Sequence, residues 1–133
     1  MEKLASILRY MQFYGHIAHN LTSGETFFQD HAFFADLYNA YEAHYDDVVE
    51  RSIGLGMSID LFKAHNSACQ LLSKNQFTDA CSAIDKLQEA ERVLCSTINT
   101  ELEDKTEGTK QLLGEIMNQS EMRQYKMQQR VKK

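Results

Sequence analysis

The chain contains no proline and no tryptophan among its 133 residues. Proline breaks helix interiors, so its absence leaves nothing to interrupt long helices. No apolar stretch approaches the ~20 residues that span a bilayer, and we therefore expect no membrane segment. The first ten residues, MEKLASILRY, lack the uniform apolar core of a signal peptide. Together these absences predict a helical protein of the cytoplasm.

Cysteine is scarce, and the common catalytic motifs are missing. The three cysteines, Cys69, Cys81 and Cys95, form no C-x-x-C pair, so the sequence suggests neither a zinc knuckle nor a dithiol redox motif. An odd number of scattered cysteines fits a reducing cytoplasm, and we interpret all three as helix-packing residues. The motifs E-x-x-H, H-E-x-x-H, G-x-S-x-G and a glycine-rich phosphate loop do not occur.

The net charge is −5, which argues against a broad nucleic-acid surface. The last eleven residues, RQYKMQQRVKK, differ from the rest because they carry five positive charges and no negative one. The five are Arg123, Lys126, Arg130, Lys132 and Lys133. This segment, residues 123–133, is interpreted either as a basic tail that binds DNA phosphates or as a solubilising, frayed helix end.

Apolar residues follow helical spacing along almost the whole chain. The pattern predicts long helices at 4–22, 27–55, 77–102 and from 112 onward, and a short helix at 59–72. The second helix has the clearest pattern, with apolar residues in steps of 4 and 3 until Gly54 and Gly56 end it. Thr26 and Gln29 are predicted to form its capping box.

The predicted fold is all-α, with residues 1–133 in a single domain. Four long helices with a short extra helix between the second and third indicate a four-helix bundle. The second helix also carries Phe28, Phe33 and Leu37 away from its main apolar seam. A helix that is apolar nearly all round is covered on two sides, which suggests a partner chain.

Two histidines and two acids are candidates for a metal site. In an antiparallel hairpin of the first two helices, His19 falls close to His31. Asp46 and Glu50 are spaced i, i+4, so their carboxylates share one helix face. Imidazole and carboxylate together suit iron, zinc or manganese. However, His31 and Asp46 lie ~22 Å apart along one continuous helix, so the two pairs cannot meet within one chain.

Two interpretations of these residues remain open. The pairs are unrelated, with a core histidine and a solvated acidic face, or a second subunit supplies the missing half of each site. Antiparallel pairing of two copies about a two-fold axis near 37–41 would place His31 of one copy against Asp46 and Glu50 of the other. Both acids lie off the apolar seam and so face away from their own core.

The motifs around these residues resemble those of a known family. The stretch "AHN…G…FF…H" followed by "YDDVVERSIGLG" is similar to the signature of the Dps proteins, the DNA-protecting miniferritins. That signature has A-H-W-N, then a glycine, an aromatic residue and a histidine, and later D-x-x-A-E-R ahead of a Leu-Gly helix end. The resemblance covers nearly the whole chain and is sharpest from residue 16 to 56.

The resemblance implies a ferritin-like bundle that assembles into a hollow homododecamer. Such a shell oxidises Fe(II) with peroxide or dioxygen at sites between subunits and stores ferric iron inside. By position, His19 and His31 would be the catalytic metal ligands of one subunit, and Asp46 and Glu50 those of its two-fold mate. Zinc or manganese would suit the same donors.

The sequence departs from the family at two positions. The Asp expected four residues after the second histidine is Ala35, and the expected Trp after the first is Asn20. His16 and Asp47 are candidates to compensate. His44 and His65, which no motif includes, are interpreted as structural or surface residues. The alternatives are a Dps-like shell with a lost ferroxidase centre that acts by binding DNA, and an all-helical interaction protein without metal.

Overall fold

The computed structural model describes all residues from 1 to 133 and is entirely helical. It contains five helices and no strand: α1 (Glu2–Leu21), α2 (Phe27–Gly54), α3 (Leu61–Lys74), α4 (Ala80–Glu101) and α5 (Glu107–Val131). The all-α class is thus confirmed, and the predicted order of long and short helices matches the observed one. None of the five helices combines the length and apolarity that crossing a bilayer requires.

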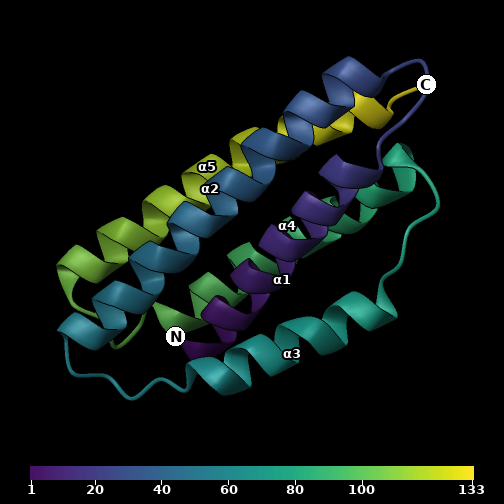
Figure 1. The fold of residues 1–133 in the computed structure, drawn as a ribbon. Coiled ribbons are helices and arrows are strands. Elements are labelled where there is room, and N and C mark those ends of the chain that lie inside the picture. The colour runs from purple at the N-terminus through teal and green to yellow at the C-terminus, as the bar shows by residue number, and fades with distance from the viewer.

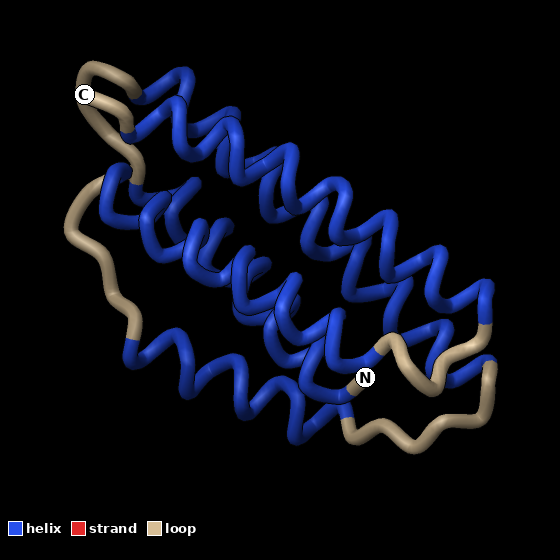
Figure 2. Tube along the Cα trace, turned by 180° about the vertical axis from the view of Figure 1, so that it is seen from behind, coloured by secondary structure: helices blue, strands red, loops and turns tan.

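The four long helices lie side by side, and α3 lies outside them (Figure 1). α1 and α2 form one antiparallel hairpin, and α4 and α5 form a second. α3 packs along α1 and returns the chain from the end of α2 to the opposite end of the molecule, where α4 begins (Figures 1 and 2). α2 and α4 consequently run in the same direction.

A single apolar core joins the helices. Twenty-five buried apolar side chains form one cluster, and α2 contributes Phe34, Leu37, Tyr41, Tyr45, Val48 and Val49 to it. Apart from Leu37 and Val49, these residues belong to the 4-3 pattern that predicted the helix. Gly56 follows the end of α2 with a φ of +73°, a backbone conformation that glycine adopts without a steric penalty.

The predicted capping box at the start of α2 is wrong. The Thr26 side chain accepts no hydrogen bond from the backbone and instead donates from Oγ1 to Asp30 Oδ2 at 2.7 Å. Asp30 in turn pairs with Arg130 near the end of α5. A partner one hundred residues away therefore determines the local geometry. The one complete capping box lies at the start of α4, between Asp79 and Ser82.

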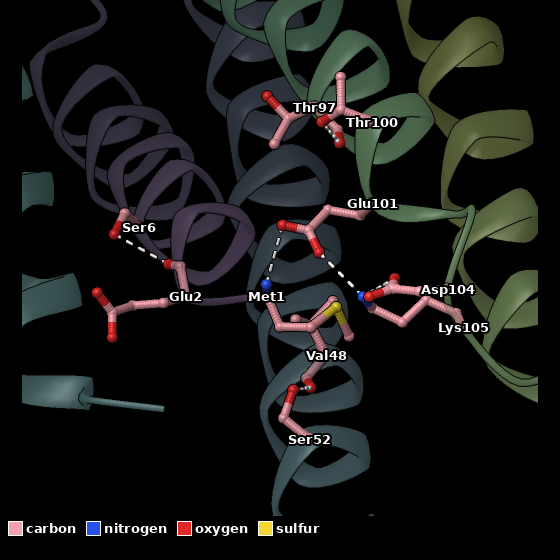
Figure 3. Close-up of polar contacts among 10 residues, drawn as sticks. All are labelled: Met1, Glu2, Ser6, Val48, Ser52, Thr97, Thr100, Glu101, Asp104 and Lys105. Atoms are coloured by element: carbon pink, nitrogen blue, oxygen red, sulfur yellow. Dashed lines mark hydrogen bonds and ion pairs between the residues drawn. The ribbon is translucent and has the colours of Figure 1, made fainter. Parts of the chain in front are cut away.

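The start of α1 is fixed to the end of α4 by an ion pair. The amino group of Met1 donates to Glu101 Oε1 at 3.0 Å, and Lys105 Nζ lies 3.3 Å from Glu101 Oε2 (Figure 3). Both contacts keep the pKa of the Glu101 carboxyl below its usual value even though burial acts in the opposite direction. This cluster holds three segments together at one end of the molecule.

The interpretation of the cysteines as packing residues is wrong for two of the three. Cys69 and Cys81 are exposed, and only Cys95 is partly buried. Cys95 Sγ donates to Ser120 Oγ at 3.2 Å, which links α4 to α5. Cys81 Sγ instead accepts a hydrogen bond from Arg130 Nη1.

Candidate metal half-site on the α1–α2 hairpin

The hairpin of α1 and α2 brings His19 and His31 into direct contact. Their imidazole rings stack with centroids 3.6 Å apart and planes 22° apart. Gly15 lies one turn before His19 on α1, and Tyr38 lies two turns after His31 on α2. These two residues are adjacent: a Cβ at Gly15 would lie 3.4 Å from the Tyr38 Cβ. The missing side chain lets the two helices approach closely at this level. The predicted closeness of His19 and His31 is confirmed.

Each of these histidines is oriented by the backbone of the other. His19 Nδ1 lies 2.7 Å from the His31 carbonyl oxygen, and His31 Nδ1 lies 2.9 Å from the His19 carbonyl oxygen. A carbonyl oxygen only accepts, so both Nδ1 atoms carry the hydrogen and donate it. In the neutral rings, the lone pair is then on Nε2, the atom that is free to bind a metal. A backbone carbonyl that fixes the tautomer in this way is a common feature of metal-ligating histidines.

Further rings surround the histidine pair. Phe27 stacks on His31 with centroids 4.8 Å apart. Tyr38 contacts His19 edge-on at 5.4 Å and stacks on His16 at 4.3 Å. These contacts restrict the imidazoles to one arrangement before any ligand binds. Tyr38 was not predicted as a neighbour of the site, although its spacing of seven residues from His31 puts both on one side of α2.

The predicted carboxylate ligands lie elsewhere on the same helix. Asp46 and Glu50 are both exposed, and α2 runs without a break from His31 to Glu50. Fifteen residues separate His31 from Asp46, or ~22 Å along the helix. No three His, Cys, Asp or Glu side chains within one chain converge on a position that suits a metal ion. The four predicted ligands therefore form two separate pairs in a single chain.

The positions proposed to compensate for Ala35 are both at the surface. His16 is exposed and lies one turn before His19, with ring centroids 6.2 Å apart. Asp47 is exposed beside Asp46 and lines a shallow surface depression together with Glu50. The side chain of Ala35 itself is partly buried.

One face of α2 is exposed along most of its length. It is an exposed stripe with large apolar residues at its two ends and mostly small or polar ones between them. We call it the α2 stripe: Phe28, Ala32, Asn39, Ala43, Asp46, Glu50 and Ile53. Phe28 is 82% exposed and Ile53 59% exposed. Small residues in the middle of a helix face allow a second helix to approach closely.

The core contains a buried polar cluster that was not predicted from the sequence. Arg123 donates to Glu91 through Nε at 2.6 Å and Nη2 at 3.0 Å, and through Nη1 to His44 Nε2 at 3.0 Å. Burial raises the pKa of the Glu91 carboxyl, whereas the Arg123 guanidinium acts in the opposite direction. Burial, with the Arg123 charge adding to it, lowers the pKa of His44 to about 4. The interpretation of His44 as a structural residue is therefore supported.

A signal for this cluster was present in the sequence. Glu91 occupies an apolar seam position between Leu87 and Leu94, and Arg123 precedes the buried Met127 by four residues. Opposite charges at seam positions of two helices that are joined by a short loop indicate a buried ion pair.

The five basic residues near the end of the chain do not form one free tail. α5 continues as a helix to Val131, so this end is not frayed. Arg123 is buried in the pair with Glu91. Arg130 donates to both carboxylate oxygens of Asp30 at 2.8 Å, and this contact lowers the pKa of Asp30. Lys126, Lys132 and Lys133 are exposed and carry the remaining charge.

Comparisons with known proteins give no assignment. No protein-family model matches the chain, and no curated protein matches it in sequence. The function is therefore inferred from the residues themselves.

Proposed function

We propose that the chain is a Dps-like miniferritin subunit. In this proposal it belongs to the ferritin-like bundles, assembles into a hollow homo-oligomer in the cytoplasm, oxidises Fe(II) at sites shared by two subunits and stores ferric iron inside. Support comes from the motif resemblance around His19 and Glu50 and from the order of the five helices.

One observation contributes most to the proposal: the reciprocal hydrogen bonds between His19 and His31. Each Nδ1 donates to the carbonyl oxygen of the other residue, which leaves two Nε2 lone pairs on adjacent, stacked rings. Neither Nε2 has a hydrogen-bond partner within the chain, and both rings are only partly buried, so both lone pairs are open to a ligand. The arrangement suits a divalent metal ion that is bound from outside the hairpin.

The α2 stripe supports a second copy as the source of the carboxylates. If two α2 helices pair antiparallel, His31 of one copy lies level with Asp46 and Glu50 of the other. The same pairing puts Phe28 level with Ile53, because each lies three residues outside His31 and Glu50 respectively. Two exposed apolar side chains would thus cover each other next to the metal site.

The histidines of one copy and the carboxylates of the other would together favour the oxidation of Fe(II). Two neutral imidazoles and two carboxylates neutralise a divalent ion and stabilise the ferric state more than the ferrous one, because anionic oxygen donors favour the higher charge. Fe(II) is the substrate, and peroxide or dioxygen accepts its electrons. The protein contributes the arrangement of donors and the exclusion of competing ligands.

The experiment compares His31→Ala and Glu50→Ala with two matched controls. His65→Ala removes a partly buried histidine on α3, and Glu121→Ala removes an exposed carboxylate on α5. Anaerobic Fe(II) titration followed by peroxide should show binding and oxidation in the parent and the controls, and at least a tenfold loss in both site variants. Oxidation at the parental rate in His31→Ala and Glu50→Ala would contradict the proposal.

A further inference from the structure

We propose that Tyr38 supplies an electron, through its contact with the His16 and His19 rings, when the site reduces hydrogen peroxide. The inference rests on the proposed function, because it concerns the oxidation step at the same site. It assigns a role to a residue that is outside the four ligands.

The donor set provides for one metal ion at each site. His19, His31, Asp46 and Glu50 offer two imidazoles and two carboxylates, which complete the coordination of a single ion. The residue one turn after His31 is Ala35, which has no donor atom. One Fe(II) per site releases one electron, whereas reduction of peroxide to water and hydroxide takes two.

Tyr38 can provide the second electron with a balanced reaction. One Fe(II), one H2O2 and one phenol give one Fe(III), one hydroxide, one water and one tyrosyl radical. The O–O bond breaks, the phenol O–H bond breaks, and its proton ends in the water that is formed. Without this donor, the same one-electron step would release a hydroxyl radical.

The position of Tyr38 favours it over the other rings. It is the one tyrosine whose ring contacts either His16 or His19, stacked at 4.3 Å on the first and edge-on at 5.4 Å to the second. Phe27 is as close to His31 but has no phenol to oxidise. Tyr41 is fully buried beside Arg123, away from these histidines. The side chain of Tyr38 is partly exposed, so its radical could be reduced again by small molecules.

The test uses the parent, Tyr38→Phe and the control Tyr125→Phe, which changes an exposed tyrosine on α5. Each protein is loaded anaerobically with one Fe(II) per subunit, mixed with one equivalent of hydrogen peroxide and frozen for electron paramagnetic resonance. The parent and Tyr125→Phe should give a tyrosyl radical and consume one peroxide per Fe(II). Tyr38→Phe should lose at least nine-tenths of that signal while a spin trap detects hydroxyl radical.

Failure of this inference can be separated from failure of the proposed function. If the parent binds and oxidises Fe(II) but consumes one peroxide per two Fe(II) without a radical, Tyr38 is not the donor and the site assignment stands. The same holds if Tyr38→Phe keeps the radical. If the parent does not bind Fe(II), the proposed function is wrong and this inference is overturned with it.

Discussion

His19 and His31 each donate from Nδ1 to the other's carbonyl oxygen, although twelve residues and a turn separate them. Because both bonds involve the backbone, substitutions of neighbouring side chains would leave the tautomers in place. The hairpin thus prepares two Nε2 donors within one chain, and the question that follows is what supplies the rest of the coordination.

The first prediction concerns the α2 stripe. Ala32→Arg places a long side chain on the face that is proposed to pair with a second copy. Because this side chain is much larger than the methyl group it replaces between two closely packed helices, the subunit affinity should fall by about tenfold to a hundredfold. Light scattering should show an oligomer for the parent and smaller species for the variant.

The control for this prediction is Gln128→Arg, which adds the same charge at an exposed position of α5. It should assemble like the parent, and both variants should retain parental helix content by circular dichroism. A parent that remains a single chain, or an Ala32→Arg variant that assembles normally, would show that the α2 stripe is not an interface.

The second prediction concerns the buried pair of Glu91 and Arg123. Arg123→Ala leaves a carboxylate unpaired in the core and should reduce the free energy of unfolding by about 3–5 kcal/mol. Replacing both partners, as Glu91→Leu with Arg123→Met, should come within about 1 kcal/mol of the parent or exceed it. Urea unfolding measures both. A loss in the double variant as large as that in Arg123→Ala would contradict the prediction, because removing the Glu91 carboxylate would then have restored no stability.

The third prediction is a loss of stability in mild acid that comes from His44. Its pKa is lowered from 6.5 to about 4 in the folded chain, so the unfolded chain takes up the proton first as pH falls. The contribution of neutral His44 to the free energy of unfolding is complete above pH 6.5 and declines between pH 6.5 and 4. It amounts to roughly 3 kcal/mol at 1.36 kcal/mol per pKa unit.

His44→Gln is the matched variant for this third prediction, because an amide oxygen still accepts from Arg123 but does not titrate. Unfolding at a series of pH values, with chelator present, should show a shallower decline in the variant than in the parent. Glu91 and Glu115, which also face this region, remain in both proteins and cancel in the comparison. Parallel pH profiles would exclude His44 as the cause.

The fourth prediction concerns the basic end of the chain. Deleting residues 123–133 should unfold the protein, because Arg123 and Met127 are buried in the core. Changing Lys126, Lys132 and Lys133 together to Ala should leave the free energy of unfolding within about 0.5 kcal/mol of the parent. Only this triple variant tests DNA binding without unfolding the protein.

A gel shift at several salt concentrations then decides the question. A shift that the triple variant loses would support a DNA-binding end, and an unchanged shift would show that these lysines are not required. Arg130→Ala, in contrast, should destabilise the protein by about 1–3 kcal/mol, because it breaks the two charge-assisted bonds to Asp30.

The periodic parts of the fold could be predicted from the sequence, and the long-range polar contacts could not. The 4-3 spacing of α2 determines which face is buried, so its bounds were predicted to within one residue. Thr26 was misassigned because its partner Asp30 is oriented by Arg130, one hundred residues away. Glu91 and Arg123 were missed for a different reason: their charges occupy seam positions of α4 and α5, a pattern that indicates a buried pair only when both helices are considered together.

In the candidate site, too, the local contact could be predicted from the sequence and the other neighbours could not. The contact of His19 with His31 follows from one short hairpin and was predicted. The neighbours of these rings, Tyr38 above all, depend on how closely the helices approach at Gly15, which spacing alone does not give. The place of Asp46 and Glu50 in a shared site stays a prediction, because it requires a second chain.

Co-assembly of two inactive variants tests that shared site most directly. In a two-fold pair of one His31→Ala chain and one Glu50→Ala chain, both changes fall in one site and leave the other intact. Random co-assembly of equal amounts should therefore restore about a quarter of the parental Fe(II) oxidation sites. If the co-assembled protein stays as inactive as either variant alone, histidines and carboxylates from different subunits do not share a metal ion, and the account is wrong.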